Sequence, residues 1–347
     1  MRLTTEPVGG WLAATGPDAD VVIATRVRLA RNLADVPFGV KTRTPDQERV
    51  VETVRWTLQD LGYLKQGRFF TDEQLAEPTG PFFVERHLAS PDFLNTKVRR
   101  GLYVSQDETI SLMVNEEDHL RFQALASGLD FATAFGKAAT LDEKLESQLA
   151  YAFSPEFGFL TACPTNVGTG MRASVLVHLP ALVLTREIEK VLRGAGHIGL
   201  AVRGLFGEGT ATRGNFFQVS NQRTIGQSEA EILETISEIS HQIVDYEHKA
   251  RDYLVRNMRV EIEDKVFRSL ALLKGARMLS SDEATNLLAT VRLGVCLGLI
   301  NEVTLEMVGR LLVLTRPANL QVLLGETLTP AERDERRATF VRQALVH

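Results

Sequence analysis

The sequence is poor in cysteine, tryptophan and lysine. Of its 347 residues only two are cysteine, Cys163 and Cys296, and only two are tryptophan. Two cysteines cannot build a disulfide framework or a multi-cysteine zinc site, so each is expected to be a buried apolar residue or a working thiol. Arginine outnumbers lysine 30 to 9, a bias that genomic base composition or thermal adaptation also produces, and it proves no function.

Long apolar runs and an excess of positive charge are missing as well. One of the longest apolar runs, Leu293–Ile300, falls far short of the roughly 20 residues that span a membrane, and the N-terminus lacks the apolar core of a secretory signal. The formal net charge is −5, which gives no reason to expect nucleic acid or an anionic membrane as a partner. We therefore expect a cytoplasmic protein that binds neither directly.

What is present is the composition of a folded protein, 44% hydrophobic and 24% charged, with material for two domains. Up to residue 221 short strand patterns alternate with helical stretches, which indicates an α/β or α+β domain. The strand patterns cover residues 21–29, 110–114, 157–162, 174–179, 198–202 and 216–220. The helical patterns cover residues 45–62, 116–131, 140–151, 181–193 and 228–258.

After residue 260 only helix signals remain, so about the last 90 residues are expected to be all-helical. Ser280–Glu283 and Thr329–Glu332 fit capping boxes, the second with proline at the first helical position. On the helix that the second cap opens, Arg333 and Arg337 share a face and Asp334 lies on its border. From spacing alone, a solvated charged helix end explains this trio better than a binding site.

The densest cluster of ionisable groups is Asn115–Arg121, with sequence NEEDHLR, directly after the strand at 110–114. If a helix begins near Glu116, then Glu117 and Arg121 lie four residues apart on one face and present a carboxylate and a guanidinium to the same cleft. An acidic helix start with a routine Glu–Arg pair explains the cluster equally well.

A second basic cluster lies in the segment Thr25–Arg31. In a strand Arg26 and Arg28 point to the same face, and Val27 and Leu29 point to the other. Two guanidiniums on one sheet face suit a polyphosphate, because each binds oxygens bidentately and keeps its proton. Taken alone, a solvated outer face is the simpler explanation.

Two segments have the composition of shaped loops. Cys163 stands in the proline- and glycine-containing segment 161–172, where it is either a reactive thiolate beside arginines or a small buried apolar group. Seven glycines between residues 194 and 214 predict either a loop that closes over substrate or a disordered connector. The histidines are not spaced as metal ligands, so we expect structural roles for them, among them His119, His178 and His197.

In order and spacing, four segments resemble the ATP:guanidino phosphotransferase family, which includes creatine kinases, arginine kinases and bacterial protein-arginine kinases. They are Thr25–Arg31, Asn115–Arg121, Cys163–Ser174 and Arg203–Asn221, and NEEDHLR followed by CPTNxGTxxRAS is highly specific. The resemblance implies an α+β fold. Residues 1–255 would form the catalytic domain, a mainly antiparallel sheet flanked by helices, and residues 256–347 a smaller all-α domain.

The resemblance also implies a role for each matching residue. The substrates and cofactors would be ATP and Mg²⁺, with the phosphates bound by five arginines: Arg26, Arg28, Arg121, Arg172 and Arg203. Glu117 would be the catalytic base and Glu208, in the glycine segment, the second clamp on the substrate guanidinium. Cys163 would face the substrate, and Glu116 would act on the water shell of the magnesium ion.

Two departures from the small-molecule kinases point to the protein-arginine kinase branch. Only 24 residues precede Thr25, so the helical N-terminal domain of those kinases is expected to be missing. Leu176 stands where they place a histidine near the nucleotide, which leaves the adenine contacts open. The segment Arg333–Ala338 is similar to an RDxxRA motif of the branch, which implies that Arg333, Asp334 and Arg337 bind phosphoarginine.

The resemblance thus implies a kinase that transfers the γ-phosphoryl group of ATP to exposed arginines of proteins and marks them for Clp-type degradation. An activator protein, a Clp ATPase or protease, and a second copy bound through the C-terminal domain are the partners it implies. One alternative is a kinase for free arginine or another small guanidino compound. The other is a phosphoarginine-reading adaptor with a decayed kinase site, against which the retained arginines, both glutamates and Cys163 speak.

Overall fold

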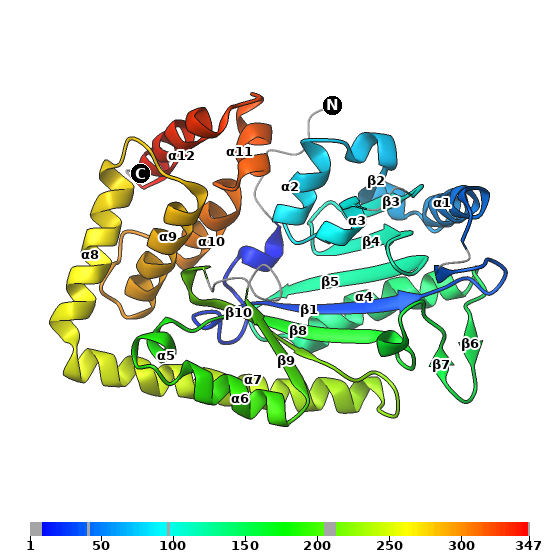
Figure 1. Ribbon diagram of the computed structural model, residues 1–347, viewed down its shortest axis with the longest axis horizontal. Coiled ribbons are helices and arrows are strands. Elements are labelled where there is room, and N and C mark those ends of the chain that lie inside the picture. Colours follow the sequence, from blue (N-terminus) through cyan, green and yellow to red (C-terminus); the bar gives the residue numbers. More distant parts are fainter. Residues whose placement is uncertain (1–8, 40–41, 96–97, 205–212, 346–347) are drawn as a thin grey trace.

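The computed structural model describes residues 9–39, 42–95, 98–204 and 213–345. At its centre lies an eight-stranded antiparallel sheet with the strand order β2-β3-β4-β5-β1-β8-β10-β9 (Figure 1). In that order the strands are Gly67–Thr71, Gly101–Ser105, Ile110–Val114, Leu120–Ser127, Val22–Arg31, Met171–His178, Phe216–Asn221 and Leu200–Gly204. A separate hairpin pairs β6 (Phe153–Ser154) with β7 (Gly158–Phe159).

One face of the sheet carries the main hydrophobic core. Alternate strand residues such as Val27 and Phe122 point to this face and are fully buried. They pack against the apolar sides of α1 (Thr44–Asp60), α4 (Phe131–Glu146) and α7 (Glu229–Asn257). Two short helices, α5 (Pro180–Leu184) and α6 (Ile188–His197), lie beside α7 (Figure 1).

The other face of the sheet is covered only in part. Over β2 to β5 a second core forms with the 3₁₀ helix Gly10–Leu12, α2 (Thr79–Glu85) and α3 (Pro91–Asn95). The rest of this face, over β5, β1, β8, β10 and β9, carries polar and basic side chains, among them the arginines that the sequence singled out.

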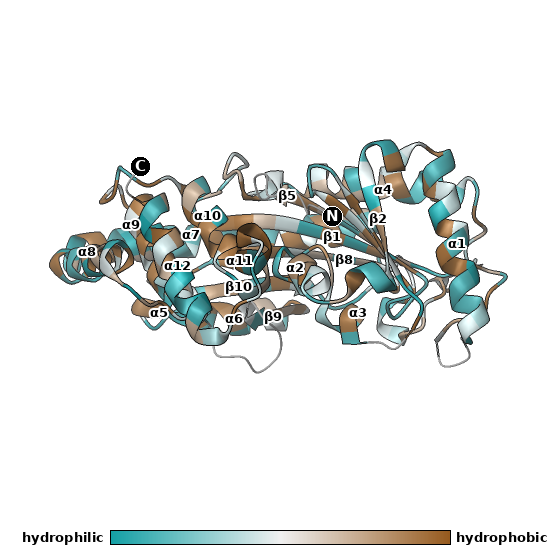
Figure 2. Cartoon of the chain, turned by 90° about the horizontal axis from the view of Figure 1, so that it is seen from above, coloured by the Kyte–Doolittle hydropathy of each residue, from teal (hydrophilic) through white to brown (hydrophobic). Residues whose placement is uncertain are grey.

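The C-terminal helices gather at one end of the molecule, and α1 lies at the opposite end (Figures 1 and 2). They are α8 (Arg259–Gly275), α9 (Ser281–Cys296), α10 (Leu305–Leu314), α11 (Pro317–Leu324) and α12 (Pro330–Ala344). Thr329 caps α12 with the predicted capping box. Among the described residues, none of the helices combines the length and the apolarity that crossing a bilayer requires.

The α+β class, the antiparallel sheet and the helical C-terminal part are confirmed, whereas several local predictions are wrong. The predicted helix at 116–131 is a turn followed by β5, because its residues pair with β1 and β4. The predicted strand at 157–162 shrinks to the two residues of β7. Of the predicted helix at 140–151 only residues 140–146 are helical, as the end of α4, and the predicted helix at 181–193 is split into α5 and α6.

Candidate active site

The strand register brings the five predicted phosphate-binding arginines to one face of the sheet. Arg28 of β1 lies opposite Arg172 of β8, and directly opposed side chains of antiparallel strands share a face. Arg121 lies opposite Ala30, two residues from Arg28, so it points to that face too. Arg203 lies opposite Gln218, and Gln218 lies opposite Leu176, four residues after Arg172.

Like charges dominate this face. Burial, together with the charges of Arg121 and Arg172, lowers the pKa of Arg26 to about 10. The pKa of Arg28 is lowered as well, by burial first and then by its arginine neighbours. The Nε atom of Arg28 is buried and has no hydrogen-bond partner among the described residues. Such a cluster is unfavourable by itself and suits a ligand with several negative charges.

Arg121 is oriented by Glu116, across the hairpin turn between β4 and β5. Its Nη1 donates to Glu116 Oε2 at 2.5 Å, and Ser90 Oγ donates to the other oxygen at 2.7 Å. Asn115 opens the turn with a φ of 60°, a conformation that asparagine tolerates better than most residues. The predicted helical pairing of Glu117 with Arg121 is therefore wrong, since the turn brings Glu116 to the arginine.

Glu117 projects from the same turn and is exposed. Partial burial and the adjacent charge of Asp118 raise the pKa of its carboxyl group. Asn166 Nδ2, from the loop that carries Cys163, donates to Glu117 Oε2 at 3.5 Å, and the nearby Cys163 side chain partly offsets the rise in the pKa of that carboxyl group. The structure thus brings together two of the three predicted catalytic residues. The third, Glu208, lies outside the described residues.

The loop that carries Cys163 is held against the Glu117 turn by contacts that the sequence did not predict. Asp118 Oδ1 accepts the backbone N–H of Ala162 at 2.6 Å and the side-chain amide of Asn32 at 2.7 Å. Asn32 in turn accepts the backbone N–H of His119 at 2.8 Å. These buried contacts join residues 44 to 87 positions apart, so no local sequence signal marks them.

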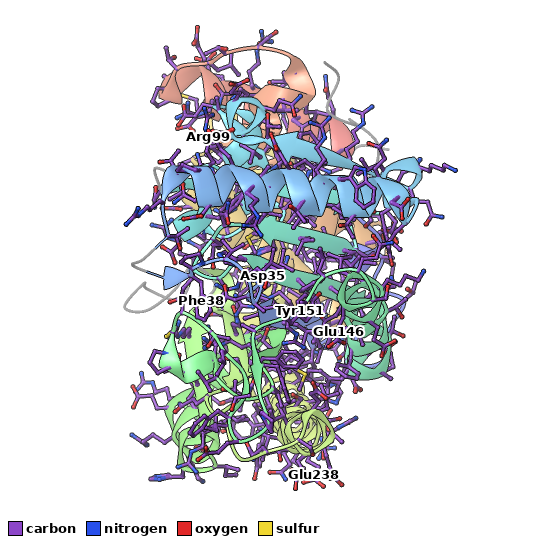
Figure 3. All side chains as sticks on the ribbon, turned by 90° about the vertical axis from the view of Figure 1, so that its right-hand side faces the viewer. Asp35, Phe38, Arg99, Glu146, Tyr151 and Glu238 are labelled. Atoms are coloured by element: carbon purple, nitrogen blue, oxygen red, sulfur yellow. The ribbon has the colours of Figure 1, made fainter. Side chains whose placement is uncertain are left out.

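His119 is structural, as predicted. Its Nδ1 accepts the N–H of Leu33 at 3.1 Å, so the hydrogen of the neutral ring lies on Nε2, 3.2 Å from the carbonyl oxygen of Pro37. Burial lowers its pKa and favours this neutral form. The ring of Phe38, labelled in Figure 3, packs edge-on against it with the centroids 6.1 Å apart.

A pocket of about 680 Å³ opens beside the arginines. Arg172, Arg203 and Asn166 line it, and Leu192 of α6 forms part of its wall. Gly168 lets the Cys163 loop close one side: its φ is +111°, and a Cβ atom there would lie 2.3 Å from the carbonyl oxygen of Thr224. Among the described residues, no group of three or more potential side-chain ligands could hold a metal ion without a bound substrate.

The predicted phosphoarginine residues lie on α12, in the C-terminal group of helices (Figure 1). Arg337 is buried, and its guanidinium donates to the carbonyl oxygens of Thr315 and Leu279 and to Asp334 Oδ1. The Asp334 side chain remains 31% exposed, and Arg333 is half-buried. Of these three residues, only Arg333 and Asp334 therefore expose part of their side chains to solvent.

Comparison with known proteins places these features in context. Residues 49–250 match the family model of the ATP:guanido phosphotransferase C-terminal catalytic domain, and residues 259–347 match that of the protein-arginine kinase McsB C-terminal domain. The protein-arginine kinase of Symbiobacterium thermophilum is 44% identical over 99% of this chain and 98% of its own length. That of Halothermothrix orenii is 42% identical over 99% and 98%.

Solved structures share the fold at lower identity. The taurocyamine kinase of Schistosoma mansoni with bound transition state analog components aligns with a TM-score of 0.60 and 22% identity, over 73% of this chain and 37% of that one. A lombricine kinase aligns with a TM-score of 0.59 and 22% identity, over 72% of this chain and 71% of that one.

Proposed function

The chain belongs to the ATP:guanido phosphotransferase family and is a protein-arginine kinase, and from this premise we propose how its residues act. The arginine face binds the phosphates of ATP, and Glu117 positions and deprotonates the arginine side chain of a protein substrate. The product is phosphoarginine, with a new N–P bond to the former γ-phosphoryl group.

The observation that carries this proposal is the crowding of guanidiniums on one face of the sheet. Burial and the positive charges of neighbouring arginines lower the pKa of both Arg26 and Arg28. Bound phosphates would relieve that repulsion and supply an acceptor for the orphaned Nε of Arg28. The same guanidiniums would then stabilise the charge that spreads over the phosphoryl group during transfer.

The surroundings of Glu117 raise the pKa of its carboxyl group, which makes the carboxylate a stronger base. A guanidinium is a poor nucleophile, because it holds its proton up to high pH and its lone pairs are delocalised. A carboxylate that grips it fixes one nitrogen in line for attack and accepts the proton as the N–P bond forms. Glu208 is proposed as the second carboxylate of this grip, and Cys163, whose loop contacts Glu117 through Asn166, as the group that faces the substrate.

Magnesium fits the site only together with ATP. When bound to the phosphates, Mg²⁺ neutralises part of their charge. Glu116 is proposed to accept a hydrogen bond from its water shell, through the lone pair that Ser90 leaves on Oε1. Its larger contribution is to hold Arg121 toward the phosphates, since the Glu116 side chain is only 3% exposed.

The substrate class is tested by competition. The purified protein is incubated with Mg·ATP and equal arginine concentrations of an unfolded protein and free arginine, and acid-labile phosphate is measured on each. We expect phosphate on the protein. Turnover of free arginine alone would assign the chain to the small-molecule kinases.

From family membership we extend the proposal to Clp-type degradation of the product, an activator protein and a homodimer.

We also propose that the first two turns of α12 bind phosphoarginine. Arg337 fixes the Asp334 carboxylate by donating a hydrogen bond to Oδ1. The exposed part of Asp334 can then accept the N–H groups of phosphoarginine, while Arg333 binds the phosphate group of that ligand. Calorimetry with a phosphoarginine peptide compares the wild type with Asp334→Ala and with the exposed neighbour Glu335→Ala. We expect at least about a tenfold loss of affinity for the first variant only. Equal affinities for all three proteins would exclude the site.

A further inference from the structure

A large groove lies on the side of α6 that faces away from the arginine pocket. It has a volume of about 940 Å³ and runs between α6 and α7; we call it the α6–α7 groove. Its α7 side is a stripe of apolar residues spaced alternately four and three apart: Ile239, Ile243, Tyr246, Ala250 and Tyr253. Such spacing places them on one helical face.

The chain covers this stripe incompletely. Ile239 and Ile243 are buried, but Tyr246 and Tyr253 are 49% and 55% exposed, and Ile198 at the end of α6 is 53% exposed. Large apolar side chains that lie together and remain exposed mark an interaction surface more often than isolated ones do. The stripe therefore has the pattern of a helix that receives another apolar segment.

The rim of the groove is basic, although the chain as a whole carries a net charge of −5. Arg186, Lys190 and Lys249 line it together with a single acid, Glu187. Lys190 lies 3.8 Å from Glu187 with 82% of its side chain exposed, so this contact leaves the ammonium available. The Lys249 ammonium lies 5.7 Å from the centre of the Tyr246 ring. A ligand that covers the stripe therefore meets positive charge at its edges.

Helix α6 separates this groove from the arginine pocket. Val191, Gly194 and Ala195 line the groove, whereas Leu192 and Gly196 line the pocket. The helix leads into β9, which carries Arg203. A ligand that packs on one side of α6 therefore acts on a wall of the phosphate site.

The sequence of α6 leaves it weakly stabilised. Gly194 and Gly196 lie within this ten-residue helix, and glycine destabilises a helix interior relative to alanine. Apart from the adjacent residues and the backbone of α6 itself, a Cβ atom at either position would meet no atom within 4 Å, so packing does not require glycine there. Only Ala195 of the helix is fully buried. Contacts from a bound ligand would thus order α6.

We propose that the α6–α7 groove binds an acidic amphipathic helix of a partner protein, and that its binding tightens the ATP site through α6. Apolar side chains of the partner cover the α7 stripe, and its carboxylates meet Lys190 and Lys249. The proposed binding of the helix depends only on the features of the α6–α7 groove. The proposed effect on ATP affinity also depends on the proposed function, in which the arginine face binds ATP.

Binding is tested with labelled model peptides of about 20 residues, long enough to form a helix. One carries leucine at helical spacing with glutamate elsewhere, and the other carries lysine in place of glutamate. Fluorescence anisotropy should show that the acidic peptide binds the full-length wild type at least about tenfold more tightly than the basic one. The double variant Lys190→Glu and Lys249→Glu should lose that affinity about tenfold, whereas Lys265→Glu, exposed on α8, should keep it.

Equal binding of both peptides, or equal binding to the rim variant and its control, would overturn the proposal. A rim variant that changes the oligomeric state in light scattering would identify a second copy of the chain as the occupant of the groove, and would overturn the proposal too.

Calorimetry of Mg·ATP binding tests the coupling between the groove and the ATP site. The acidic peptide should tighten ATP binding severalfold, and so should the double variant Gly194→Ala and Gly196→Ala without peptide. Unchanged ATP affinity with intact peptide binding would refute the coupling. Absent ATP binding would refute the proposed function while leaving the groove intact.

Discussion

At the scale of single residues, the proposed phosphate site is an arrangement of like charges that is unfavourable without a bound anion. Arg26, Arg28, Arg121 and Arg172 repel one another on a partly buried sheet face. Among the described residues, one acidic side chain forms an ion pair with this cluster: Glu116, which contacts Arg121. Residues placed for binding at the expense of stability are common at functional sites.

This conflict predicts opposite effects of Arg28→Gln on stability and binding. Without nucleotide, the midpoint of thermal unfolding should rise by roughly 2 °C, because one repelling charge is removed. The affinity for Mg·ATP should fall by at least about tenfold, because a charged hydrogen bond is lost. Thermal unfolding with and without Mg·ATP measures both effects, with the exposed Arg68→Gln as control. A lower midpoint together with an unchanged response to Mg·ATP would contradict this account.

At the scale of elements, one buried ion pair fastens β1 to α4. Arg31 Nε and Nη2 donate to Asp142 Oδ2 at 3.0 and 2.6 Å, and its Nη1 donates to the carbonyl oxygens of Ala30 and Thr169. The guanidinium also lies over the ring of Phe159 at 3.5 Å. Tyr151, labelled in Figure 3, donates its hydroxyl to the backbone of Asp142 at 3.3 Å.

Removal of the acid should therefore be costly. Asp142→Ala leaves the Arg31 guanidinium buried without its counter-charge, which typically lowers the free energy of unfolding by about 3–5 kcal/mol. Urea unfolding followed by circular dichroism measures the change. The exposed pair of Arg268 with Asp264, 3.7 Å apart, provides the control, and Asp264→Ala should lower that free energy by less than about 1 kcal/mol. Similar losses for both variants would show that burial of the pair is unimportant.

The elements also show what could be predicted from sequence. Alternation in β1 placed Arg26 and Arg28 on one face, and the structure confirms this because period-two patterning is a local property. Leu120–Ser127 contains leucine, glutamine and alanine, which favour helices, yet pairing with β1 and β4 makes it a strand. The contact of Arg121 with Glu116, instead of Glu117, follows from that pairing. The link of Asp118 to Ala162 and Asn32 depends on tertiary contacts and has no local signal.

At the scale of the whole molecule, histidines that the fold keeps neutral make stability depend on pH. Burial first, and then the charges of Arg26 and Arg316, lower the pKa of His87 to about 3, whereas an unfolded histidine titrates near 6.5. Because the folded-state pKa is depressed, the stabilising contribution is complete above about pH 6.5 and is lost as the pH falls toward 3.

His87→Asn tests this linkage, since asparagine tolerates the positive φ of 58° at this position. From pH 7.5 to 5.5 the wild type should lose about 1 kcal/mol more free energy of unfolding than the variant does. Urea titrations at the two pH values measure the difference. An equal loss in both proteins would show that His87 titrates alike in the folded and unfolded chain.

The central claim is that Glu117 is the base of a protein-arginine kinase, and a single-turnover measurement tests it most directly. Wild type, Glu117→Gln and the exposed control Glu143→Gln are mixed in excess with an unfolded arginine-containing protein and limiting Mg·ATP, and acid-labile phosphate is followed with time. With the fold and ATP affinity unchanged, Glu117→Gln should slow phosphorylation by about 10²–10⁴-fold and the control should not. A rate near that of the wild type for Glu117→Gln would contradict the account.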